Sequence, residues 1–117
     1  MRMGMETAIR RTLTDDGTAV VVVAGEVDFT NADDVAKCIE DAVSEWQPGV
    51  VRVDLQHAAF IDSTGLGALI TGYRAASDAD TGFEVVNASP GFQRVLAVTG
   101  LCELFGLSVA DESDIAI

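Results

Sequence analysis

A continuous run of β-branched and small apolar residues at positions 18–25 restricts the possible folds of this 117-residue chain more than any other feature. The run begins at Thr18, passes through four consecutive valines and ends at Gly25. Continuous runs of this kind are typical of central strands that are buried on both faces of a sheet. The sequence therefore predicts a central strand here, with a weaker strand before it at about 7–13.

After this strand, the apolar residues change to the spacing of an amphipathic helix. The stripe consists of Ala32, Val35, Ala36, Ile39, Ala42, Val43 and Trp46. Three- and four-residue spacing places all of these side chains on one helix face. Thr30 or Asn31 is expected to cap the helix, and Thr30 with Asp33 resembles a capping box. Pro48 and Gly49 are expected to end the segment.

The same alternation continues in the second half of the chain. A strand is predicted at 50–55, followed by a second helical stripe formed by Leu66, Leu69, Ile70 and Tyr73. A further strand is expected at 82–86, then a helix from the N-cap Ser89 to the C-cap Gly100 and a short strand at 107–109. Parallel strands need crossover connections of this length. The sequence predicts one α/β domain over 1–117, with a mixed, mostly parallel sheet of about four to five strands flanked by helices.

The charge balance indicates which partners suit the surface. Seven Lys and Arg residues against 19 Asp and Glu residues give a formal net charge of −12. Such a surface repels nucleic acid and anionic membranes, and a basic protein surface is the better-matched partner. Cys38 and Cys102 lack CxxC spacing and are expected to be reduced thiols in apolar surroundings. With no signal-peptide pattern and no run long enough to span a bilayer, we expect a cytoplasmic protein.

The segment at 53–70 is the most informative for function. Asp62, Ser63 and Thr64 lie where a strand and loop give way to a helix, and capping alone would explain their side chains. Gly65 and Gly67 follow, although each costs about 1 kcal/mol in a helix interior relative to alanine. Small residues in the first turn leave the backbone uncovered, so another macromolecule can approach Ser63. A phosphate on Ser63 would meet free N–H groups and the positive end of the helix dipole.

With these motifs, nearly the whole chain resembles the anti-sigma factor antagonists, whose domain is called STAS and also occurs in sulfate transporters. The segments that carry the resemblance are 25–28 (Gly-Glu-Val-Asp), 60–69 around Asp62-Ser63-Thr64-Gly65, and 89–101. The resemblance implies a single STAS-like domain that acts as a partner switch. The unphosphorylated protein would bind an anti-sigma factor that is a serine kinase of the GHKL type, and a sigma factor would be released. Phosphorylation would reverse this binding, and a serine phosphatase would reset the cycle.

The resemblance also assigns individual residues. Ser63 matches the phosphoacceptor, Thr64 lies where the family often has a second serine, and Asp28 matches an acidic loop residue near the acceptor. The expected partner-binding surface consists of Asp28, Asp62, Ser63, Thr64, Gly65, Leu66 and Gly67. No catalytic residue, cofactor or metal is expected, and the oligomeric state stays open. The departures from the family pattern are Thr64 in place of serine and a last helix that is expected to be cut short after Ile117.

Other readings of the same residues remain as alternatives. The chain could be another STAS-type module, such as a stressosome-like scaffold or an accessory subunit of lipid transport. Another alternative is a small serine hydrolase using Ser63 and the single histidine, His57, but 61–65 lacks the first glycine of the Gly-x-Ser-x-Gly elbow. Asp28, Asp54 and Asp62 could gather around a cation, although carboxylates at strand ends are more often solvated or capping groups.

Overall fold

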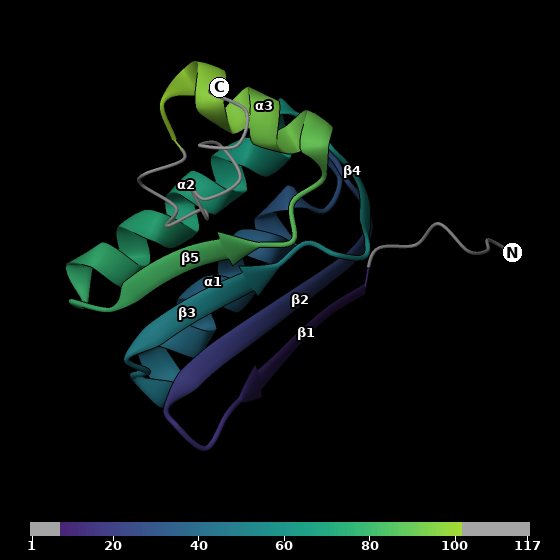
Figure 1. Cartoon of the computed structure of the whole chain (residues 1–117). Coiled ribbons are helices and arrows are strands. Elements are labelled where there is room, and N and C mark those ends of the chain that lie inside the picture. Colours follow the sequence, from purple (N-terminus) through teal and green to yellow (C-terminus); the bar gives the residue numbers. More distant parts are fainter. Residues whose placement is uncertain (1–7, 102–117) are drawn as a thin grey trace, which may run out of the picture.

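The computed structural model describes residues 8–101 and contains five strands and three helices (Figure 1). In chain order these are β1 (Ala8–Leu13), β2 (Thr18–Val27), α1 (Ala32–Trp46), β3 (Val50–Asp54), β4 (Ala58–Ile61), α2 (Ser63–Asp78), β5 (Gly82–Val86) and α3 (Pro90–Thr99). The strand predicted at 107–109 and Cys102 lie outside the described residues.

The five strands form one mixed sheet, as the sequence predicted. Its main order is β1-β2-β3-β5, with β1 antiparallel to β2 and the other pairs parallel. The unpredicted strand is β4, which pairs in parallel with the end of β2. The register shifts between Gly25 and Glu26, and Gly25 has φ = 90°, a conformation that favours glycine. After this bend β2 leaves β3 and pairs with β4.

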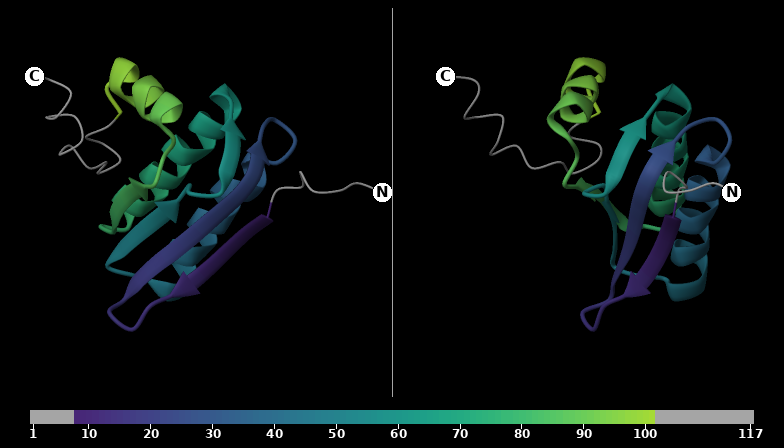
Figure 2. Two further views of the ribbon diagram at one scale, coloured as in Figure 1. Left: turned by 45° about the vertical axis from the view of Figure 1, so that its right-hand side comes forward. Right: turned by 90° about the vertical axis from the view of Figure 1, so that its right-hand side faces the viewer.

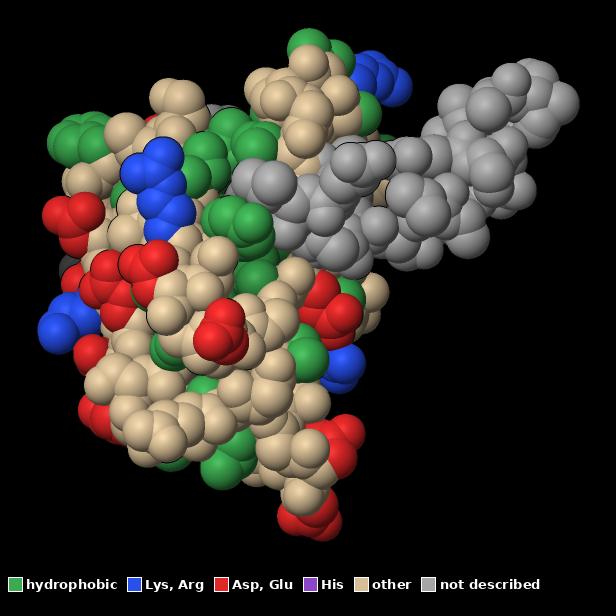
Figure 3. Space-filling view, turned by 90° about the vertical axis from the view of Figure 1, so that its left-hand side faces the viewer, with side chains coloured by type: hydrophobic (Ala, Val, Ile, Leu, Met, Phe, Trp, Pro, Cys, Tyr) green, Lys and Arg blue, Asp and Glu red, His purple; other side chains and the backbone are tan. Residues whose placement is uncertain are grey.

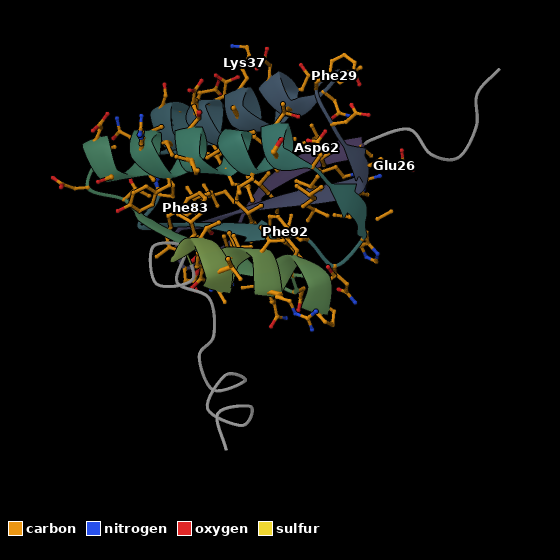
Figure 4. The ribbon with its side chains drawn as sticks, turned by 90° about the horizontal axis from the view of Figure 1, so that it is seen from above. Glu26, Phe29, Lys37, Asp62, Phe83 and Phe92 are labelled. Atoms are coloured by element: carbon orange, nitrogen blue, oxygen red, sulfur yellow. The ribbon has the colours of Figure 1, made fainter. Side chains whose placement is uncertain are left out.

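The helices lie on both sides of the sheet. α1 and α2 pack against each other on one face, while α3 lies on the other side near the carboxyl ends of the strands (Figures 2 and 4). Val21 and Val23 of β2 are buried in the core with Val35 and Ile39 of α1. Val20 and Val22, which point to the opposite face, are only half-buried. Within residues 8–101, β2 is thus fully buried on one face and not on both.

The helix starts differ from one another in how they are capped. Ser89 caps α3 as predicted, with its Oγ accepting from the N–H of Phe92 at 3.1 Å, and Gly100 ends the helix at φ = 78°. The capping prediction for α1 was wrong, although Asn31 occupies the N-cap position. Its Oδ1 accepts from the N–H of Asp28, and its Nδ2 donates to the carbonyl of Glu26. These bonds bind the β2–α1 loop to the end of β2 instead of capping the helix.

Candidate functional site

The predicted site forms where β2 and β4 end side by side. Val27 pairs with Ile61, and the N–H of Asp62 donates to the carbonyl of Val27 at 3.2 Å. Asp28 and Asp62 each follow one of these paired residues, so the β2–α1 loop lies beside the start of α2. Figure 4 shows Phe29, Asp62 and Glu26 toward this end of the molecule, with Phe83 toward the other. The structure thereby brings together two acidic residues that are 34 positions apart in the sequence (62 − 28).

Asp62 is the N-cap of α2. Its Oδ1 accepts three hydrogen bonds, from the N–H of Thr64 at 2.9 Å, the hydroxyl of Thr64 at 2.5 Å and the N–H of Gly65 at 3.0 Å. The Thr64 hydroxyl, followed by the Gly65 N–H, lowers the pKa of the Asp62 carboxyl below its ordinary value. Asp62 is therefore ionised near neutral pH and holds the first turn of the helix in place.

The two hydroxyls that follow Asp62 have different surroundings. Ser63 is exposed at the first position of α2, and its hydroxyl has no hydrogen-bond partner within residues 8–101. Thr64 is also exposed, but its hydroxyl donates to Asp62. A group transferred to Thr64 would have to break that bond, whereas the Ser63 oxygen is available as it stands. The geometry thus distinguishes the two candidate acceptors.

The β2–α1 loop repeats the arrangement at Asp62. Oδ1 of Asp28 accepts from the N–H of Thr30 at 2.9 Å and from the Thr30 hydroxyl at 2.5 Å. Asp28 and Asp62 therefore each bind the threonine two residues later, through the same atoms and at the same distances. Within residues 8–101, the hydroxyls of Thr30 and Thr64 are thus bonded to an aspartate, whereas that of Ser63 is not.

Gly65 and Gly67, which the sequence placed together on the surface, have different environments. Gly65 is buried, and a Cβ there would lie 2.6 Å from Cγ2 of Ile61 and 2.9 Å from Cγ1 of Val27. Gly67 is exposed, and a Cβ there would meet nothing within 4 Å. Leu66 is half-buried and packs on the core. Gly65 is thus required by the packing of α2 on β2 and β4, whereas Gly67 is not required by packing.

A groove runs between α1 and α2 from this site, and the sequence analysis did not identify it. Phe29 and Thr64 lie at the end where both helices begin, and Ala32, Ala36, Gly67 and Ala68 line the groove farther along. We call this the α1–α2 groove. Phe29 is 78% exposed, although an aromatic side chain of its size is usually buried. An aromatic residue directly after the motif acid Asp28 was the sequence signal that could have marked it.

Asp54 and His57 have other surroundings than the predicted acceptor. Asp54 accepts from Nδ2 of Asn87 at 3.0 Å and from the N–H of Gln56 at 2.9 Å, and His57 is exposed in the turn before β4. Within residues 8–101 no three His, Cys, Asp or Glu side chains group as metal ligands would. Trp46 and Tyr73 are half-buried packing residues, as predicted.

Within residues 8–101, Cys38 does not mark a second chemical site. The half-buried Cys38 is a free thiol, and burial raises its pKa, which makes it a poor nucleophile at neutral pH. None of the helices in the described part of the chain is long and apolar enough to cross a membrane. Figure 3 shows the end of the molecule opposite β4 and the start of α2, and acidic side chains are dispersed there and not gathered at one place.

The comparisons with known proteins agree on one family. A sequence model of the STAS domain matches residues 10–114. The chain is 29% identical to an anti-sigma-B factor antagonist of Listeria monocytogenes over 85 residues, which cover 72% of this chain and 73% of that protein. It is 26% identical to an anti-sigma F factor antagonist of Paenibacillus polymyxa, with 75% of each chain covered. The crystal structure of an anti-sigma factor antagonist from Mycobacterium paratuberculosis superposes with a TM-score of 0.76 at 30% identity, covering 90% of this chain and 87% of that one.

Proposed function

Because the chain belongs to the STAS domain family, we propose that it is an anti-sigma factor antagonist switched by phosphorylation of Ser63. In the unphosphorylated form it binds an anti-sigma factor that is a serine kinase of the GHKL type, and the sigma factor is released. The kinase transfers a phosphoryl group to Ser63 and the complex separates. A serine phosphatase then restores the binding form.

The observation that carries this proposal is the free hydroxyl of Ser63 beside a fixed first helical turn. Asp62 holds the N–H groups of Thr64 and Gly65 and the hydroxyl of Thr64, which leaves Ser63 exposed and unbonded within the described residues. A kinase can therefore reach the Ser63 oxygen without unfolding the helix. The proposed binding surface comprises Asp28, Asp62, Ser63, Thr64, Leu66 and Gly67, with the buried Gly65 supporting it from below.

A phosphate at Ser63 is compatible with the fold and incompatible with a packed interface. It adds about −1.5 to −2 charges at pH 7, and the positive end of the α2 dipole offsets part of this charge. Asp62 and Asp28 lie close by, so the local charge of the surface becomes strongly negative. Desolvating an uncompensated charge in an interface costs several kcal/mol, enough to lower affinity by orders of magnitude.

We propose a binding role and not a hydrolytic one for Ser63. A serine nucleophile needs a general base within hydrogen-bond reach, and the Ser63 hydroxyl has no partner within residues 8–101. His57 is exposed in the turn between β3 and β4. A fluorophosphonate probe would label a serine hydrolase at Ser63 and is expected to leave this protein unlabelled.

The test uses purified anti-sigma factor serine kinases from the source bacterium and three variants. Ser63→Ala should bind the cognate kinase and accept no phosphate, whereas Ser63→Asp should keep a native circular-dichroism spectrum and lose binding. Ser77→Asp, which adds the same charge at the far end of α2, serves as the control and should bind as the wild type does. Equal binding by Ser63→Asp and Ser77→Asp would contradict the switch.

A further inference from the structure

We propose that the α1–α2 groove is the docking site for a basic amphipathic helix of the anti-sigma factor kinase. In this arrangement Phe29 contacts an apolar side chain of that helix, and Gly67 is the point of closest approach. The inference rests on the proposed function, because it names how the partner is held beside Ser63. It goes further by placing binding contacts along α1 and by adding Phe29 to the site.

The glycines of α2 give the first reason. Gly65 and Gly72 are explained by the fold, since a Cβ at Gly72 would lie 2.7 Å from Cδ1 of Ile39 and one at Gly65 would meet Ile61 and Val27. Gly67 has open space at its Cβ position and no positive φ, so neither packing nor backbone conformation requires glycine there. Its position on the groove gives it a use, because a residue without a side chain lets another backbone approach closely.

The exposure of Phe29 gives a second, independent reason. Phe29 is 78% exposed to solvent and lies at the end of the groove that adjoins Thr64. Aromatic side chains contribute much of the energy at protein interfaces, where they fill pockets of the partner. The neighbouring residues Asp28 and Thr30 are bonded to each other, so the loop backbone that carries Phe29 is held in place. A preorganised apolar contact of this kind is typical of an interface residue.

The charges along the groove specify the chemistry of the occupant. Asp33, Lys37 and Glu40 line it, and Lys37 lies 3.7 Å from Asp41 in an ion pair along α1. The lining thus carries two acids, Asp33 and Glu40, against one lysine, on a protein with a net charge of −12. Lys or Arg residues on the partner complement these acids. A second copy of this chain would bring the same acidic surface against itself, and nucleic acid would be repelled.

The dimensions of the groove favour a helix as the occupant. From Ala32 to Glu40 the wall formed by α1 advances eight residues, or about 12 Å at 1.5 Å per residue. α2 forms the opposite wall, with small side chains at Gly67, Ala68 and Thr71. A shallow channel between two helices with small residues along it accepts the apolar face of a third helix, as in helix-in-groove recognition.

The experiment measures the dissociation constant of the cognate anti-sigma factor kinase for the unphosphorylated protein and its variants. Gly67→Leu places a side chain in the groove, and leucine is a good helix former, so Kd should rise about tenfold or more. Phe29→Ala removes the apolar contact and should raise Kd by a similar factor. The matched controls are Gly91→Leu in α3, where a Cβ also meets nothing within 4 Å, and Val98→Ala, which removes an apolar side chain that is 82% exposed. Both controls should stay within about twofold of the wild type.

The charge of the occupant is tested in the same assay. Glu40→Gln should lower the association rate and reduce its salt dependence, whereas Asp15→Asn, at the exposed turn between β1 and β2, should not.

The outcomes separate the docking site from the proposed function. If the wild type binds the kinase and Gly67→Leu and Phe29→Ala bind it equally well, the groove is not the docking site and the proposed function stands. Absence of kinase binding by the wild type would overturn both. Groove variants that change the sedimentation coefficient of the protein alone would assign the groove to self-association and overturn the kinase helix.

Discussion

Two glycines only two positions apart in α2 should respond to alanine with opposite signs. Gly65→Ala places a methyl group 2.6 Å from Cγ2 of Ile61 and 2.9 Å from Cγ1 of Val27. Both neighbours are β-branched, so these methyls are fixed close to their backbones and cannot swing away. Overpacking of this kind costs about 1–3 kcal/mol, and the first-turn position recovers little helix propensity.

The same substitution at Gly67 should stabilise the protein. A Cβ there meets nothing within 4 Å, so the only change is the conformational preference of the residue. Replacing glycine by alanine in an exposed helix interior gains about 0.8–1 kcal/mol. The two variants should therefore differ in unfolding free energy by about 2–4 kcal/mol, which is the sum of the two effects.

Urea unfolding measures this difference directly. Gly65→Ala should lower the midpoint, Gly67→Ala should raise it, and the slope of free energy against urea should stay constant because the surface exposed on unfolding is unchanged. A Gly65→Ala protein as stable as the wild type would refute the close packing of α2 on β2 and β4.

Three further predictions concern the cap and the core. Asp62→Ala frees the Thr64 hydroxyl, so the kinase should phosphorylate both Ser63 and Thr64, and phosphopeptide mass spectrometry with phosphate still confined to Ser63 would contradict the role of Asp62 in selecting the acceptor. Because the pKa of Asp62 is lowered from its ordinary value of 3.8, its ionised form stabilises the fold above that pH. The stability advantage over Asp62→Asn should therefore be complete at neutral pH and disappear as the pH falls through the lowered pKa, as urea unfolding from pH 7 to 2.5 would measure. Ile39→Ala, at a core position with 0% exposure, should lower the unfolding free energy by about 2–5 kcal/mol, and a loss below about 1 kcal/mol would contradict its burial against α2.

The sequence predicted the elements whose signals are local. The valine run, the stripes of α1 and α2 and the Ser89 cap each depend on a few neighbouring residues, and each is present in the structure. β4 escaped prediction because it has four residues and depends on a partner more than 30 positions away. The cap of α1 was misassigned because the Thr30 side chain hydrogen-bonds to Asp28 and not to the first turn of the helix.

The site could be predicted in its residues but not in their bonding. Asp62, Ser63 and Thr64 were all recognised at the helix start, yet only their geometry distinguishes a capping acid, a free hydroxyl and a bonded one. Gly65 and Gly67 have the same sequence signal, and the packing of Ile61 and Val27 around one of them separates their roles. Phe29 was missed because a single exposed aromatic gives no periodic pattern.

The most direct test of the switch is phosphosite mapping combined with binding in one reaction. The purified protein is incubated with its cognate anti-sigma factor kinase and Mg-ATP, and the residue that carries phosphate is identified by mass spectrometry as the bound fraction is followed. The account predicts one phosphate, on Ser63, with the complex separating as that phosphate accumulates. Phosphate on Thr64 alone, no phosphate on Ser63, or a complex that persists after Ser63 is fully phosphorylated would contradict it.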